Sequence, residues 1–137
     1  DVQGKMTVDN FTFLSELAPY AENKELDILL CHASPRDPVM EFVSEDNGVE
    51  LLKLQKHFIQ LVGHTHRPLA LGWKDDKMKV VEPWDREEVD LSEAEHWILN
   101  PGSLGTKQFH IVEDRRSGWM LLELEENIKK ATWFRIE

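Results

Sequence analysis

The sequence has a single cysteine, Cys31, among its 137 residues, so no disulfide can form within the chain. A lone cysteine is typical of proteins in reducing compartments, and we expect a cytoplasmic location. Long hydrophobic runs are lacking as well. Apolar runs such as residues 28–31 are far shorter than the ~20 residues of a membrane span, and the first residues show no signal pattern, so we expect no membrane-bound form.

Positive charge is also scarce. The 16 Lys and Arg residues face 26 Asp and Glu residues, which gives a formal net charge of -10. This excess repels phosphate backbones, so we expect no nucleic-acid backbone binding. It does not exclude a phosphate ligand at a metal site, because divalent ions reverse the local field. The 41% hydrophobic and 31% charged content is typical of a globular chain, and the length suits one domain over residues 1–137.

Hydrophobic periodicity predicts alternating helices and strands in the first half and mostly strands in the second, an α/β (α+β) fold. Helices are expected at residues 8–20 and 48–55, with Asn10 or Asp9 capping the first. Nearly continuous apolar runs predict buried strands. The expected strands span residues 26–31, 58–62, 69–73, 78–82 and 96–100, with an exposed loop or short helix at 84–95 and a hairpin made by 117–125 and 131–136.

Histidines follow two of the predicted buried strands. His32 ends the first, and His64 and His66 lie in the loop that begins at Gly63. The carboxyl ends of strands in an α/β sheet are where ligand sites gather. Imidazole is the commonest metal ligand, and two histidines two residues apart can reach two ions ~3.5–4 Å apart. The His-x-His pair alone is equally compatible with two surface or core histidines.

Three motifs occur in a fixed order. They are His32-Ala33-Ser34-Pro35-Arg36, then Gly63-His64-Thr65-His66-Arg67-Pro68, then Asn100-Pro101-Gly102-Ser103. This ordered set, within residues 11–125, resembles the C-terminal motifs of calcineurin-like metallophosphoesterases and is most similar to their small bacterial and archaeal branch. The resemblance implies the C-terminal half of a metallophosphoesterase β-sandwich flanked by helices.

The resemblance implies a metal-binding role for the three histidines. His32 and His64 match the two histidines that bind the second metal of the family's two-metal site. His66 matches the histidine that binds the first metal.

The same resemblance suggests roles for five further residues. Asn100, Gly102 and Ser103 match a loop that shapes the site, although an ordinary turn also explains this segment. Arg36 and Arg67 are candidates for substrate binding, because arginine suits bidentate contact with phosphate. Each is equally a candidate for an ordinary salt bridge.

Other motifs of the family do not occur in this sequence. Asp-x-His, Gly-Asp-x-x-Asp and Gly-Asn-His-Asp precede the matching segment in the family and supply the bridging aspartate, the remaining ligands and the proposed general acid. We therefore assign no catalytic residue in this chain. The sequence also begins without methionine. We expect a partial domain, whose N-terminal segment of about two βα units is its missing partner.

The predicted function belongs to the intact protein. It would hydrolyse a phosphate mono- or diester with two divalent metal ions, and the isolated chain would be inactive. Manganese, iron, zinc, nickel and magnesium are all candidates, although imidazole ligation favours transition metals. An alternative is a non-catalytic interaction or regulatory module that kept the fold. A third is a single-metal or storage site built from His32 and His64.

Overall fold

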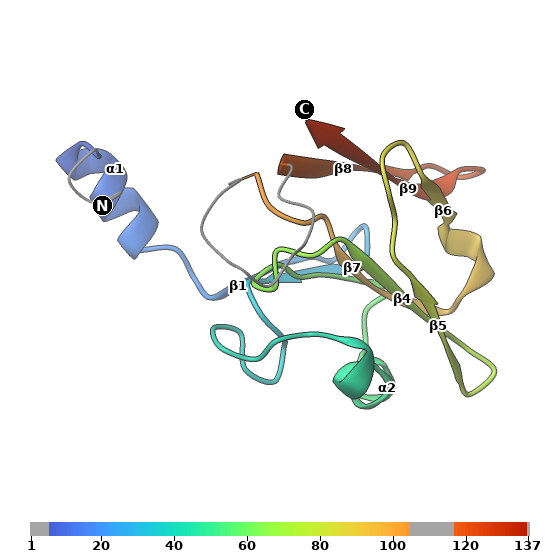
Figure 1. The fold of residues 1–137 in the computed structure, drawn as a ribbon. Helices are drawn as coiled ribbons and strands as arrows, with labels where there is room; N and C mark the ends of the chain where they lie inside the picture. Colours follow the sequence, from blue (N-terminus) through green and yellow to red (C-terminus); the bar gives the residue numbers. More distant parts are fainter. Residues whose placement is uncertain (1–5, 105–116, 137) are drawn as a thin grey trace.

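The computed structural model describes residues 6–104 and 117–136. Two β-sheets pack face to face, and one helix, α2, covers the outer face of the larger sheet (Figure 1). The molecule therefore has three layers, with an apolar core on each side of the larger sheet. The sandwich of two sheets agrees with the fold class predicted from the sequence.

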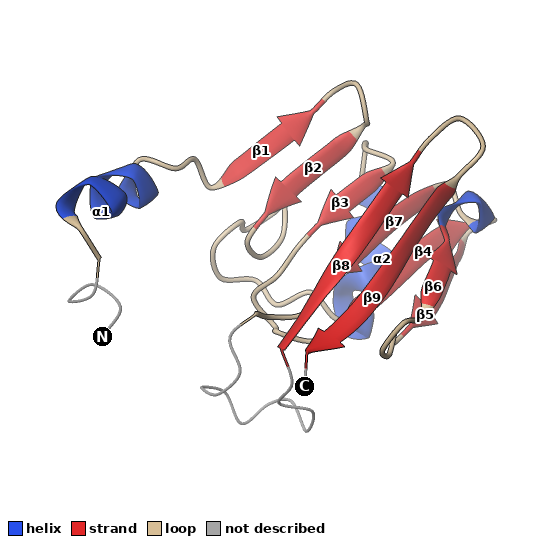
Figure 2. Cartoon of the chain, turned by 90° about the horizontal axis from the view of Figure 1, so that it is seen from above, coloured by secondary structure: helices blue, strands red, loops and turns tan. Residues whose placement is uncertain are grey.

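The larger sheet has the strand order β1-β2-β3-β7-β4-β5 (Figure 2). Its middle strands β2, β3 and β7 are parallel, whereas β1, β4 and β5 each run antiparallel to their neighbours. The six strands span Tyr20–Asn23 (β1), Ile28–Cys31 (β2), Ile59–Leu61 (β3), Leu69–Lys74 (β4), Lys77–Val81 (β5) and His96–Asn100 (β7).

The smaller sheet is antiparallel throughout, with the order β6-β9-β8. Its strands span Glu88–Asp90 (β6), Lys129–Ile136 (β9) and Ser117–Leu124 (β8). Between the sheets, the indole of Trp97 donates to the carbonyl oxygen of Leu91 at 2.8 Å, and that of Trp133 donates to the carbonyl oxygen of Asn100 at 2.9 Å. Both indoles thus bury their apolar rings without leaving the N–H unpaired.

Helix α2 spans Glu45–Leu54 and is well specified by its sequence. Ser44 and Asn47 form a reciprocal capping box at its start, and Glu45 and Asp46 stand in the first turn, where negative charge is favourable. Leu51 and Leu52 are buried against the outer face of the larger sheet. The helix predicted from the sequence begins at residue 48, three residues later than in the structure, because the prediction did not take the capping box into account.

Helix α1 spans Val8–Ser15 and ends earlier than predicted. Thr7 caps its start, so the expected caps Asn10 and Asp9 are wrong. None of its residues is buried, and it stands away from the sheets in Figure 1. Tyr20, predicted as the last residue of the helix, instead begins the edge strand β1, which was not predicted from the sequence. Neither this helix nor any other in the described part of the chain is long and apolar enough to cross a membrane.

The remaining predicted strands agree with the structure to within two residues. The exception is residues 84–95, predicted as a loop or short helix, where the short strand β6 precedes a single 3₁₀ turn at Leu91–Glu93. Val89 and Leu91 are buried between the sheets, and these two side chains attach the otherwise acidic segment to the core. Their spacing of two residues fits a strand, but two residues are too few to signal one.

Packing at Gly72 offers a test of the contact between β4 and β7. A methyl group on Gly72 would lie 2.8 Å from two ring carbons of Trp97, whose side chain is buried and fixed. We expect Gly72→Ala to lower the free energy of unfolding by about 1–3 kcal/mol through overpacking. Denaturant unfolding measures this, with exposed Lys77→Ala as the control. A Gly72→Ala variant as stable as the control would contradict this packing.

Candidate metal centre

The parallel strands β2, β3 and β7 place three predicted site residues at one edge of the sheet. His32 follows the last residue of β2, and His64 lies three residues beyond the end of β3. Asn100 is the last residue of β7. Backbone bonds hold the loops together, because Gly63 N donates to the carbonyl oxygen of His32 at 2.9 Å and Val62 N donates to that of Leu99 at 3.0 Å. The predicted convergence of the histidine loops is present in the structure.

The imidazoles of His32 and His64 are in direct contact. His32 Nε2 lies 3.0 Å from His64 Nδ1, and the rings meet edge to face with centroids 4.8 Å apart. Phe42 stacks on the other side of His64, with centroids 4.3 Å apart and an angle of 15° between the rings. The His64 ring is therefore held in place from two sides. Phe42 stands in a loop without periodicity, so no pattern in the sequence indicated this role.

One nitrogen of His64 stands out. Its Nε2 atom is buried and has no hydrogen-bond partner among the described residues. Most buried polar side-chain atoms in proteins are hydrogen-bonded, so each exception calls for a physical explanation. His66 has an interaction of its own in the structure.

The surroundings of His32 favour its neutral form. Burial lowers the pKa of His32 below its usual value, and the nearby charges of His64 and His66 lower it further. The neutral imidazole is the form that binds metal ions. In contrast, burial raises the pKa of the neighbouring Cys31 thiol to about 11. Cys31 is thus a buried, protonated thiol.

Asn100 organises the histidine loop. Its side chain is 1% exposed, and its Nδ2 donates to the carbonyl oxygen of Gly63 at 2.8 Å and to Thr65 Oγ1 at 2.9 Å. Its Oδ1 accepts from Gly102 N at 2.9 Å. One amide therefore links the loop after β3 to the loop after β7. The contact with Thr65 was not foreseen from the sequence, where this residue only separates two histidines.

The histidine loop has an unusual backbone. His64 and His66 have φ angles of 62° and 58°, in the left-handed region that non-glycine residues seldom adopt. Such conformations persist only where the surroundings determine them, and they are frequent at functional sites. Here the hydrogen bonds of Asn100 and a tight turn from Thr65 N to the carbonyl oxygen of Gly63, 2.7 Å long, hold the loop.

Gly102 and Ser103 continue the loop after β7. Gly102 has a φ of 88°, where a side chain would be strained and its Cβ would lie 3.1 Å from Pro68. The carbonyl oxygen of Ser103 accepts from Gly118 N at 2.8 Å. In the structure this segment is therefore hydrogen-bonded to the start of β8, and its role in shaping a site remains a prediction.

The two candidate phosphate-binding arginines are both engaged with carboxylates. Arg36 pairs with Glu41 and with Glu50, and Arg67 pairs with Glu45 and Glu82. Hydrogen bonds from Arg36 and from Ser34 lower the pKa of Glu41, which keeps this carboxyl ionised. Substrate binding by either arginine would have to displace or share these ion pairs, and it remains a prediction.

The imidazole pair meets one geometric requirement of a metal site. Two nitrogens bound to one ion at ~2.0–2.1 Å are separated by about 2.9–3.3 Å in octahedral or tetrahedral coordination. The 3.0 Å between His32 Nε2 and His64 Nδ1 falls within this range. Within residues 6–104 and 117–136, however, no three His, Cys, Asp or Glu side chains are grouped to hold an ion. The residues present therefore fit part of a metal site.

Comparison with known proteins adds evidence on the fold. No protein family model matches the chain, and no curated protein is significantly similar to it. Among solved structures, a metallophosphoesterase from Sphaerobacter thermophilus is similar with a TM-score of 0.81 and 23% identity, over 98% of this chain and 53% of that one. A hypothetical protein from Pyrococcus horikoshii OT3 has a TM-score of 0.64 and 15% identity, over 98% of this chain and 46% of that one.

These similarities confirm the fold inferred from the three motifs, a calcineurin-like metallophosphoesterase fold. The chain spans about half the length of the two solved structures, which fits the predicted C-terminal half. At this level of identity the likeness concerns the fold and leaves the chemistry of the site to be argued from its residues.

Asn100 provides a test of how the histidine loop is held. We expect Asn100→Ala to lower the free energy of unfolding by about 1–3 kcal/mol, because it leaves buried partners unpaired. It should also shift the ring NMR signals of His64 and His66, while those of His96, at the opposite end of β7, stay unchanged. Ring signals unaltered by the substitution would show that Asn100 does not position the loop.

Proposed function

We propose that the intact protein to which this chain belongs is a metal-dependent phosphoesterase, in which His32 and His64 bind one divalent ion and His66 contributes to a second. The observation that carries the proposal is the pair of imidazole nitrogens, His32 Nε2 and His64 Nδ1, 3.0 Å apart. The phosphoesterase fold supports it. The remaining ligands, the bridging carboxylate and the general acid would come from the N-terminal segment.

In this proposal the residues of this chain bind the metal ions and hold the metal ligands in position. Divalent ions at such a site supply charge stabilisation and an activated water. His32 favours its neutral form, because burial and the nearby charges of His64 and His66 lower its pKa. Phe42 and Asn100 fix the orientation of His64 and of its loop. Such support resembles the outer contacts that orient metal ligands in other sites.

The proposal predicts a large effect of removing His64 from the intact protein. We expect His64→Ala to lower kcat/KM for a phosphate ester such as p-nitrophenyl phosphate or its bis-ester by about 10²–10³-fold, the equivalent of several kcal/mol of lost charge stabilisation. Assays with each of Mn²⁺, Fe²⁺, Zn²⁺, Ni²⁺ and Mg²⁺ would also identify the preferred ion.

His96→Ala is the matched control, because His96 stands at the opposite end of β7 and bonds the carbonyl oxygen of His57. It should leave kcat/KM unchanged. An intact protein that binds metal ions yet hydrolyses no phosphate ester would favour the interaction module. Metal-dependent turnover by the 137-residue chain alone would contradict the claim that catalysis needs the N-terminal segment.

We further propose that this N-terminal segment docks along β8. Among the described residues, β8 pairs only with β9, so its other edge offers unpaired backbone groups. Trp119 and Leu121 are 42% and 43% exposed on its outer face, and Trp119 stacks on Phe134 at 4.3 Å. Long apolar edge strands are usually covered in folded proteins, because they would otherwise template aggregation. An α/β segment would complete the sheet and cover this face.

This docking can be tested with the N-terminal segment as a separate polypeptide. We expect Leu121→Glu to raise the Kd of association by about 10–100-fold, since burying a leucine contributes ~1.5–3 kcal/mol and 1.4 kcal/mol is tenfold. Titration calorimetry measures this. Val80→Glu is the control, because Val80 on β5 is similarly exposed but lies on the other sheet. Equal effects of both variants would place the interface elsewhere.

A further inference from the structure

The loop between β2 and α2, residues 32–44, carries exposed apolar side chains beside the candidate metal centre. Val39, Met40 and Phe42 are all more than half exposed. Single apolar residues on a protein surface are common, but a group of them next to a ligand site often marks a binding surface. Phe42 is the member of this group that contacts the site, because its ring stacks on His64.

Hydrogen bonds hold this loop on both sides of Phe42. Asp37 Oδ1 accepts from the backbone nitrogens of Val39 at 3.2 Å and Met40 at 3.0 Å. On the other side, Asn47 Nδ2 of helix α2 donates to the carbonyl oxygen of Phe42 at 2.8 Å. The backbone that carries the ring is therefore fixed before any ligand binds, and a surface of this kind loses little conformational entropy on binding.

The Phe42 ring has one face that remains open. His64 stacks on one face, with the ring centroids 4.3 Å apart and an angle of 15° between the planes. Phe42 is nevertheless 52% exposed. Because the stacked imidazole covers one side of a flat ring, the exposed surface of the side chain includes the opposite face and the edge. An accessible aromatic face thus lies directly behind a proposed metal ligand.

The charged side chains of the neighbouring loops are already paired. Besides histidines, residues 32–44 and 63–68 contain two cationic side chains, Arg36 and Arg67. Each is paired with two carboxylates. A second phosphate group on a substrate would therefore have to displace these ion pairs, whereas an uncharged flat ring would meet the open face of Phe42.

We propose that the substrate is a phosphate ester with an aromatic ring close to its phosphorus, and that Phe42 is the surface on which this ring stacks. The proposal rests on the phosphoesterase function proposed above. An ion bound by His64 brings the phosphate of the substrate close to Phe42, since the two side chains are in contact. Aromatic rings attract one another in offset stacks beyond the gain from burying their area, and an alkyl group lacks this attraction. Phe42 is thus a specificity-determining residue.

Phosphonates that cannot be hydrolysed test this specificity without an activity assay. With Mn²⁺ and the intact protein, we expect phenylphosphonate to bind at least about tenfold more tightly than methylphosphonate, because it adds apolar burial and stacking. Cyclohexylphosphonate, which has a ring of similar size that is not flat, should bind at least about threefold more weakly than phenylphosphonate. Titration calorimetry gives all three Kd values.

The outcomes of this titration separate the two proposals. Equal Kd values for phenylphosphonate and methylphosphonate, as expected if the N-terminal segment covers Phe42, would overturn the aromatic specificity and leave the phosphoesterase function standing. Equal values for the phenyl and cyclohexyl compounds would overturn stacking. If none of the three phosphonates binds, both proposals fail.

Variants of Phe42 separate stacking on the substrate from support of His64. Phe42→Leu should reduce the preference for phenylphosphonate over methylphosphonate to less than about threefold, because it removes the aromatic face. A residue that only holds His64 would weaken both ligands alike, so an unchanged preference would overturn the proposal. Phe42→Trp covers the case in which Phe42→Leu does not fold. It should keep the full preference, and its loss there would contradict the stacking role.

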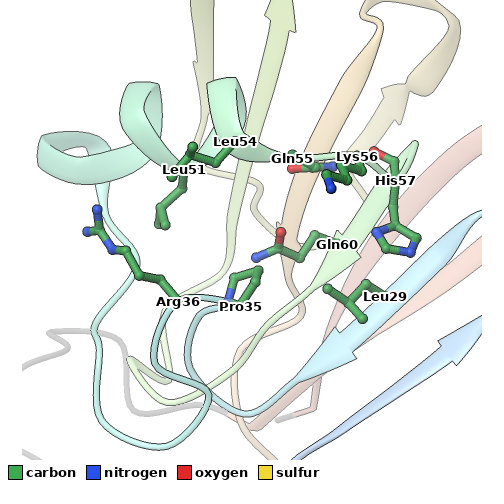
Figure 3. Close-up of a pocket in the computed structure, with 9 residues that line it drawn as sticks. All are labelled: Leu29, Pro35, Arg36, Leu51, Leu54, Gln55, Lys56, His57 and Gln60. Atoms are coloured by element: carbon green, nitrogen blue, oxygen red, sulfur yellow. Dashed lines mark hydrogen bonds between the residues drawn. The ribbon is translucent and has the colours of Figure 1, made fainter.

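Leu54→Ala is the matched control for these variants. Leu54 is also more than half exposed, but it stands at the C-terminal end of α2, where it lines a pocket of about 310 Å³ (Figure 3). The substitution should leave the ratio of the two Kd values unchanged. A ratio that falls as much as in Phe42→Leu would show that the preference does not arise at Phe42.

Discussion

The parallel pairing of β2, β3 and β7 is the constraint on which the candidate metal centre depends. Because parallel neighbours end at the same edge of a sheet, the residues that follow them must meet there. His32, His64 and Asn100 are separated by as many as 68 positions in the sequence, and this edge brings them into one hydrogen-bonded cluster. Asn100 then fixes the position of the neighbouring loop at this edge, since its side-chain amide donates hydrogen bonds to Gly63 and Thr65 in that loop.

Contacts in the core between the two sheets also help to fix the positions of the site residues. Trp133 of β9 donates to the carbonyl oxygen of Asn100, so the smaller sheet is hydrogen-bonded to the strand that ends at the site. On the outer face, α2 and its loop carry Phe42 and Glu45, which contact His64 and Arg67. Packing on both faces of the larger sheet therefore determines where the loop histidines lie. The strain at His64 and His66 persists because this surrounding structure determines it.

The sequence predicted the parts of this arrangement that local pattern encodes. The apolar runs before His32 and Gly63 identified buried strands, and the three ordered motifs identified the fold. It did not predict β1, because all four residues of this edge strand are exposed and carry no buried-strand pattern. The stacking of Phe42 and the hydrogen bond to Thr65 depend on tertiary contacts over 22 and 35 positions, which no local pattern records. For the same reason, the sequence did not show which carboxylates pair with Arg36 and Arg67.

The central claim is that His32 and His64 bind the same ion. Anomalous diffraction from crystals of the intact protein soaked in Mn²⁺ tests this most directly. We predict an ion about 2.0–2.3 Å from both His32 Nε2 and His64 Nδ1, with the direct contact between the two rings replaced by bonds to the metal. Anomalous density that lies away from this pair, with the two imidazoles still hydrogen-bonded to each other, would contradict the account.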